Sequence, residues 1–157
     1  MLPKKLLLID DNEDNRTLVK MTLEITTNWT IVTASGGLEG ISEAKAQIPD
    51  VILLDLLMPE LDGLNVYNIL KNNEITCDIP IIFMTAAVNN KILTELGNTN
   101  AQGILTKPLN TVTLASDVAN FCGWHFFSEG KKNRLKILSG KRKSNTCQLR
   151  RIYSNPI

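Results

Sequence analysis

The chain has 157 residues, a length typical of one domain with room for a short appendage. Hydrophobic residues make up 43% and charged residues 21%, which is ordinary for a globular chain and excludes the disordered, collagen-like and disulfide-dense classes. The net charge of +1 hides an asymmetry, because residues 1–128 sum to −7 and residues 129–157 sum to +8, which predicts an acidic body with a basic tail.

The first apolar run, Lys5–Ile9, ends at two aspartates. It is too short for a signal peptide or for a membrane span, which needs about 20 apolar residues. We therefore expect a cytoplasmic protein that makes no membrane contact.

Four more short apolar runs follow within the first 110 positions. Runs this continuous are typical of strands buried on both faces of a parallel sheet, where helices cover both sides. The runs are Thr30–Ala34, Val51–Leu54, Ile79–Met84 and Gly103–Leu105.

Five helices are expected after these strands, because apolar residues recur there at intervals of three or four. The alternation of strand and helix predicts an α/β fold with a parallel sheet. The first helix covers residues 17–25 and the fourth Val88–Leu96. The residues expected to face inward on the others are Leu38, Ile41, Ala44 and Ile48 in the second, Leu64, Val66, Ile69 and Leu70 in the third, which opens at Asp62-Gly63, and Val112, Leu114, Val118 and Phe121 in the fifth (111–122).

Polar and small residues follow four of the predicted strands. In an open α/β sheet, ligands bind beyond the carboxyl ends of the strands, so these residues meet at one rim if the sheet is parallel. Taken singly, each has a simpler explanation, as a helix cap (Asp11 or Asn12) or as a surface charge. The residues are Asp10, Asp11 and Asn12 after the first strand, Asp55 after the third, Thr85, Ala86 and Ala87 after the fourth, and Lys107 and Pro108 after the fifth.

Three carboxylates at one rim repel one another unless protons or a cation compensate them. A hard divalent ion with oxygen ligands fits, and Mg²⁺ is favoured because it accepts a few carboxylates and leaves positions for phosphate oxygens. The sequence has no histidine or cysteine cluster that would indicate zinc. A carboxylate beside Mg²⁺ and a lysine can attack phosphorus and form an aspartyl phosphate. Lys107 would then pair with one phosphate oxygen and the Thr85 hydroxyl would donate to another.

The motif set resembles the receiver domain of two-component response regulators over about residues 3–124. The resemblance implies a flavodoxin-like sheet of five parallel strands in the order 2-1-3-4-5, with helices on both faces, and a receiver domain at residues 1–127. It leaves residues 128–157 as a basic C-terminal tail without an independent domain. The motifs that carry it are Asp10-Asp11, Asp55 followed by Met58-Pro59 and Asp62-Gly63, then Thr85-Ala86 and Lys107-Pro108.

The resemblance also assigns roles to individual residues. It implies that Asp55 is the phosphoacceptor, that Thr85 is the switch hydroxyl, and that Lys107 pairs with the phosphoryl group. The Lys107-Pro108 bond would be cis. The Mg²⁺ ligands implied are the side chains of Asp10, Asp11 and Asp55 and the main-chain carbonyl of Leu57.

Three positions depart from the family pattern. Ile104 stands where receivers often carry an aromatic switch residue, so a large ring cannot turn inward toward Thr85. Leu57 and Ala87 lie two positions after the acceptor and the switch hydroxyl, and neither can orient an attacking water. We therefore predict a long-lived aspartyl phosphate.

The leading hypothesis is a response regulator that is not a turnover enzyme. It would catalyse its own Mg²⁺-dependent phosphorylation on Asp55 and lose the phosphoryl group slowly. The donor would be a histidine kinase or histidine phosphotransfer protein, because His125 is the only histidine in the chain. The signal would leave by contact with a downstream protein. A metal-dependent aspartyl phosphatase is a weaker alternative, because such enzymes usually carry a second Asp where this chain has Leu57.

The output surface implied by the resemblance comprises the fourth helix, fifth strand and fifth helix, where a partner or a phosphorylation-dependent second copy would dock. Val88, Ile92 and Leu96 could belong to that surface or to the core. The aromatic run at residues 124–127 could plug the end of the sheet, or it could dock the tail or a partner.

The basic tail leaves three interpretations open. It could be solvated, it could bind the acidic body or an acidic partner, or it could bind nucleic acid, which would make the chain a DNA-associated regulator. It is too short for a DNA-binding output domain of the usual kind. Its cationic residues include Lys131, Lys132, Arg134, Lys141, Arg142 and Lys143.

Overall fold

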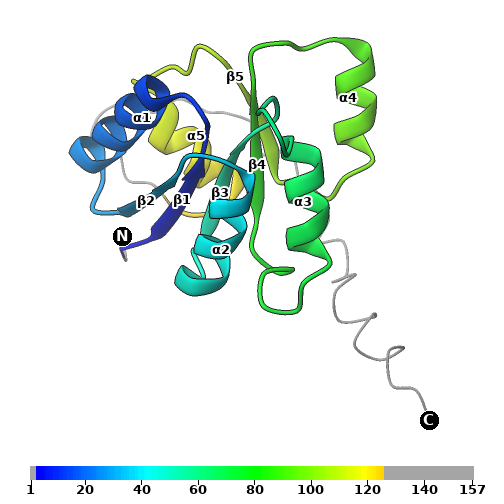
Figure 1. Ribbon diagram of the computed structural model, residues 1–157. Helices are drawn as coiled ribbons and strands as arrows, with labels where there is room; N and C mark the ends of the chain where they lie inside the picture. The colour runs from blue at the N-terminus through cyan, green and yellow to red at the C-terminus, as the bar shows by residue number, and fades with distance from the viewer. Residues whose placement is uncertain (1–2, 126–157) are drawn as a thin grey trace.

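Five parallel strands form a sheet at the centre of the molecule in this computed structural model, which describes residues 3–125 (Figure 1). The strand order is β2-β1-β3-β4-β5, which confirms the predicted fold class and topology. The tail, the domain boundary at residue 127 and the end of the aromatic run lie outside the described residues. The strands are β1 (Lys5–Ile9), β2 (Thr30–Ala34), β3 (Val51–Asp55), β4 (Ile81–Thr85) and β5 (Gly103–Thr106).

Helices cover both faces of this sheet and divide the core in two (Figure 1). Alternate residues of a strand point to opposite faces, so in β1 Leu6 and Leu8 pack toward α1 and α5, while Leu7 and Ile9 pack toward α2, α3 and α4. The helices are α1 (Glu13–Thr26), α2 (Gly37–Gln47), α3 (Gly63–Lys71), α4 (Asn90–Gly97) and α5 (Leu114–Phe121).

Side-chain caps fix where three of these helices begin. The Asn12 side chain caps α1 by accepting a hydrogen bond from the Asn15 N–H at 2.9 Å. Asp62 and Asn89 cap α3 and α4 in the same way. Of the two candidates for the first cap, Asn12 therefore has that role, and Asp11 is left exposed at the rim.

Several helical residues expected to face inward are exposed, and those predictions were wrong. Leu38 and Ile48 of the second predicted helix are exposed, because α2 packs through Gly37 and Gly40, whose lack of a side chain lets the helix approach Val66 and Ile9 closely. Ile69 is exposed on α3, where Tyr67 is buried instead and packs on Phe83 with ring centroids 5.5 Å apart. Val112 is 90% exposed because it precedes α5, and Phe121 at the other end of α5 is also exposed.

The fourth helix divides the residues whose location the sequence left open. Leu96 is buried in the core and Ile92 packs against it, whereas Val88 is exposed before the helix begins. The helix therefore contributes to both the core and the surface.

Two tryptophans close the amino end of the sheet. Trp124 packs edge-on against Trp29 with ring centroids 5.4 Å apart, and Lys4 Nζ lies 4.9 Å from the centroid of the Trp124 ring. Trp124 therefore has the packing expected of a plug, while His125 next to it is exposed. Within residues 3–125, no helix is both long and apolar enough to span a bilayer.

Candidate functional site

The predicted rim is assembled at the carboxyl ends of the strands. Asp55 is the last residue of β3 and Thr85 the last of β4, while Asp10 directly follows β1 and Lys107 directly follows β5. Asp10, Asp55 and Thr85 are buried although they are polar. Parallel pairing brings these four residues together from positions up to 97 apart in the chain.

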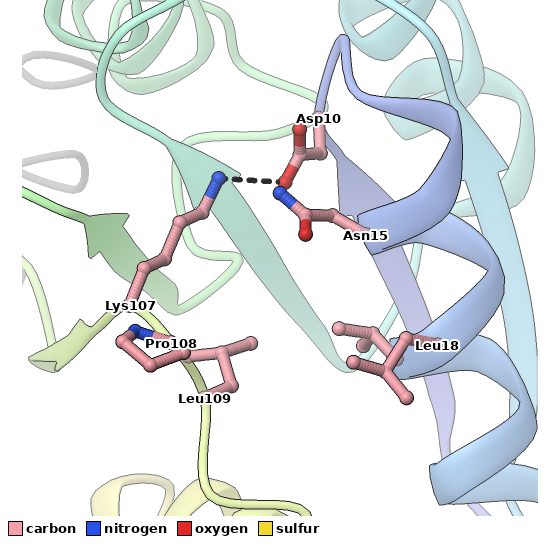
Figure 2. Close-up of a pocket in the computed structure, with 7 residues that line it drawn as sticks. Asp10, Asn15, Leu18, Lys107, Pro108 and Leu109 are labelled. Carbon is pink, nitrogen blue, oxygen red and sulfur yellow. Dashed lines mark hydrogen bonds and ion pairs between the residues drawn. The ribbon is translucent and has the colours of Figure 1, made fainter.

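Lys107 connects two of the carboxylates. Its Nζ donates to Asp10 Oδ2 at 2.9 Å and lies 3.1 Å from Asp55 Oδ2. Figure 2 shows the lysine side chain extending from the end of β5 toward Asp10, with Asn15 of α1 beside the contact. The lysine main chain is fixed as well, because its N–H donates to the Thr85 carbonyl at 2.9 Å and the Lys107-Pro108 bond is cis, as expected.

Burial and neighbouring charges shift the pKa values of this cluster. Desolvation is the main cause that raises the pKa of Asp55, and the nearby Asp10 charge adds to it, against the lowering effect of Lys107 and the Leu57 N–H. For Lys107, burial by itself would lower the pKa, but the hydrogen bonds and charges of Asp10 and Asp55 outweigh it and raise the pKa. The lysine therefore stays cationic, and Asp55 sits where negative charge is costly.

The carboxylates also form a plausible cation site. Asp10, Asp11 and Asp55 each offer an oxygen, and the three oxygens lie within 4.8 Å of one another. One lysine cannot neutralise three carboxylates, and an all-oxygen set open to solvent at Asp11 suits a hard ion that keeps water ligands. These residues therefore fit Mg²⁺.

Thr85 does not point its hydrogen bond at Asp55. Its hydroxyl donates to the Ala87 carbonyl at 3.0 Å and accepts from the Ala87 N–H at 3.2 Å. The hydroxyl is thus engaged with the loop between β4 and α4, and it would have to change partners to contact a group on Asp55.

Apolar side chains stand at the departures from the family pattern. Leu57 is 60% exposed beside the acceptor, and its N–H donates to Asp55 Oδ1 at 3.3 Å. Ala87 is exposed, and Ile104 is partly buried against the core. None of the three supplies a polar side chain.

Two supporting residues were missed by the sequence reasoning. Arg16, which lies one turn into α1, donates from Nη1 to the Asp10 carbonyl at 2.9 Å and so holds the start of the carboxylate loop. Gly63 donates to the Leu56 carbonyl at 2.8 Å, and a Cβ at this position would collide with the Asp55 carbonyl oxygen. The position of Arg16 four residues after the cap was a usable signal for the first residue. The role of Gly63 depends on tertiary contact.

A cavity adjoins the Asp10–Lys107 contact on the side of α1 (Figure 2). Its walls come from the first two turns of α1 and from the loop between β5 and α5. They are formed by Asp10, Asn15, Leu18, Lys107, Pro108 and Leu109, with Val19 behind them.

Sequence comparison matches residues 6–119 to the response regulator receiver domain family. The alkaline phosphatase synthesis transcriptional regulatory protein PhoP of Bacillus subtilis is 36% identical over 110 residues, which cover 68% of this chain and 43% of PhoP. The polar-differentiation response regulator DivK of Brucella anthropi is 29% identical over 122 residues, which cover 78% of this chain and 98% of DivK. The chain thus spans less than half the length of the first relative and nearly all of the second.

Solved structures show the same likeness. The chemotaxis protein CheY4 of Vibrio cholerae aligns with a TM-score of 0.71 at 27% identity, covering 76% of this chain and 98% of that one. A putative response regulator from Chloroflexus aurantiacus gives the same TM-score at 23% identity and covers 77% of this chain and 98% of its own, which supports the fold alone.

Proposed function

Because the chain belongs to the response regulator receiver domain family, we propose that it accepts a phosphoryl group on Asp55 and transmits a signal by protein contact. The observation that carries this proposal is the position of the Asp55 carboxylate, 3.1 Å from a lysine ammonium and clustered with Asp10 and Asp11. This arrangement places a nucleophile, a fixed cation and the ligands for a second cation at one point.

The reaction would be transfer from a phosphohistidine of another protein. An Asp55 oxygen attacks phosphorus, a P–O bond forms, and the P–N bond breaks with its electron pair left on the imidazole. Lys107 pairs with a phosphoryl oxygen and so stabilises the charge of the transferring group. Mg²⁺ held by Asp10, Asp11, Asp55 and the Leu57 carbonyl would supply further charge neutralisation.

Thr85 would then report the modification. The phosphoryl group brings roughly two negative charges to the rim, and the hydroxyl can donate to only one acceptor. If it donates to a phosphoryl oxygen, its bond to the Ala87 carbonyl is lost. The loop that leads into α4 would shift as a result, without the aromatic rotation that Ile104 cannot provide.

The partners follow from this chemistry. The donor is a histidine kinase or a histidine phosphotransfer protein, since His125 lies at the amino end of the sheet, away from Asp55. The output surface comprises α4, β5 and α5, where Val88 and Leu93 are exposed apolar residues. A downstream protein or a phosphorylation-dependent second copy would bind there by preferring one of its two conformations. We place this exchange in the cytoplasm.

The reaction is a self-catalysed modification and not a turnover cycle, because Leu57 cannot serve as an acid or base. The alternative of a DNA-associated regulator depends on residues 128–157, which lie outside the described residues, so it remains a prediction from sequence.

Incubation with acetyl phosphate and Mg²⁺, read by intact mass, tests the proposal. We expect one added phosphate, abolished by Asp55→Ala and by EDTA. The control variant Asp14→Ala removes an exposed carboxylate of the same rim that is not in the cluster, and it should still be modified. The proposal fails if the wild-type protein gains no phosphate from acetyl phosphate or from a cognate kinase, or if Asp55→Ala is modified equally.

A further inference from the structure

The outer face of α1 carries an apolar strip that the core does not use. Leu18 is 50% exposed, Met21 55% and Ile25 79%. Their spacing of three and four residues places them on one side of the helix, next to the buried side formed by Val19 and Leu23. A soluble helix face with three such residues in a row is typical of a surface that binds something.

The strip runs from the phosphorylation rim to the opposite end of the sheet. At the rim, Leu18 lines the cavity with Pro108 and Leu109 (Figure 2). Above Leu18, the first turn of α1 exposes two carboxylates, Glu13 and Asp14. The strip is therefore apolar along its length and acidic at its upper end.

The described part of the chain ends beside the lower end of this strip. Trp124 packs on Trp29, which comes three residues after α1 ends at Thr26. Both tryptophans belong to the core between the sheet and the α1–α5 layer. The 32 residues that follow position 125 therefore start on the same face of the sheet as the strip, whereas the exposed Leu38 of α2 lies on the opposite face.

Length and charge match this starting point. The 14 residues of α1 span about 21 Å at 1.5 Å per residue. An extended chain covers that distance in about six or seven residues, so a segment leaving Trp124 reaches the first turn of α1 near position 131. Phe126 and Phe127 would pass the apolar part of the strip. Lys131, Lys132 and Arg134 would arrive at Glu13 and Asp14.

We propose that residues 126–136 of this same chain bind along the α1 strip, with the two phenylalanines on Met21 and Ile25 and the basic cluster on Glu13 and Asp14. The bound segment covers the mouth of the cavity beside Lys107, so it competes with any protein that approaches Asp55 from the α1 side. The contact forms without phosphorylation and depends on ionic strength, because its upper half consists of exposed ion pairs.

Photo-crosslinking of the unphosphorylated full chain tests the proposal. p-Benzoylphenylalanine replaces Met21, and tryptic peptides are mapped by mass spectrometry at low micromolar concentration. We expect crosslinks within one molecule to residues 126–136. The matched control carries the same photo-amino acid at Leu38, an exposed leucine on the other face, and should give at least fivefold fewer crosslinks to the tail.

Charge reversal supplies a second measurement that does not touch the described fold. The triple variant K131E/K132E/R134E should reduce the crosslink yield from position 21 at least fivefold, and combining it with Glu13→Lys and Asp14→Lys should restore the yield. Equal tail crosslinks from positions 21 and 38, no tail crosslinks, or crosslinks between two molecules would each overturn the proposal. None of these outcomes bears on phosphorylation of Asp55, which the acetyl phosphate experiment tests separately.

Discussion

Lys107 sets the chemistry of the rim because it contacts two buried carboxylates at once, Asp10 at 2.9 Å and Asp55 at 3.1 Å. Each carboxylate would be costly to bury alone, and the lysine offsets part of that cost. The third carboxylate, Asp11, faces solvent and has no such partner among the ion pairs of residues 3–125. The site therefore carries an excess of negative charge that suits a divalent ion.

The side chain at position 57 should control how long the phosphoryl group persists. Leu57 is exposed beside Asp55 and cannot hydrogen-bond a water. We expect Leu57→Asn to speed loss of the phosphoryl group severalfold, because an amide can orient the attacking water. The rate is measured as loss of the phosphorylated mass after the phosphodonor is removed. Leu57→Met, which keeps the side chain apolar, is the control and should leave the rate near that of the wild type. An unchanged rate in Leu57→Asn would contradict the explanation.

At the scale of elements, the β3–α3 connection is held to the sheet by the absence of a side chain. Gly63 begins α3 against the Asp55 carbonyl and the Leu56 Cα, and its N–H donates to the Leu56 carbonyl. The same principle applies to α2, where Gly37 and Gly40 bring the helix against α3 and β1. Close approach of the backbones therefore fixes where these helices lie relative to the acceptor strand.

Gly63→Ala should lower the free energy of unfolding by about 1–3 kcal/mol, the usual cost of overpacking a site that cannot move. The control is Gly97→Ala at the end of α4, where a new Cβ meets nothing within 4 Å. That change should be neutral or should stabilise by up to about 1 kcal/mol, since alanine favours helix more than glycine does. Urea unfolding of both variants measures the difference, and equal effects would argue against the close contact.

At the scale of the whole molecule, stability depends on groups far from the rim. Lys71 at the end of α3 turns back over the loop before β4, and its Nζ donates to the carbonyls of Cys77 at 3.1 Å and Ile79 at 2.6 Å. It also lies 5.9 Å from the centroid of the Tyr67 ring. Burial lowers the pKa of Lys71 to about 8, although the charge of Asp78 acts in the opposite direction.

This shift predicts how stability changes with pH. Below pH 8 the lysine is protonated in both the folded and the unfolded protein, so its contribution is constant. Between pH 8 and the ordinary lysine value of 10.5, the unfolded chain keeps a proton that the folded protein has lost, so stability rises with pH. The slope from this group is at most about 1.4 kcal/mol per pH unit. Subtracting the urea-unfolding curve of Lys71→Met isolates this slope from other titrating groups, and parallel curves for the two proteins would contradict it.

The sequence by itself determined the fold class, the strands and the residues of the rim. Continuous apolar runs are diagnostic of strands buried on both faces, and the carboxyl ends of parallel strands must meet. The positions of Asp10, Asp55, Thr85 and Lys107 therefore followed from chain order. The roles assigned to them, and the behaviour of the tail, remain predictions.

Tertiary structure decided which face each helix buries and which partners the rim residues choose. Periodicity suggested that Leu38 and Ile69 face inward, but the close contacts of Gly37, Gly40 and Tyr67 turned both outward. A spacing pattern records only the residues of its own helix, whereas burial depends on the shapes of the elements packed against it. For the same reason, only the assembled rim shows that the Thr85 hydroxyl is bonded to Ala87 and not directed at Asp55.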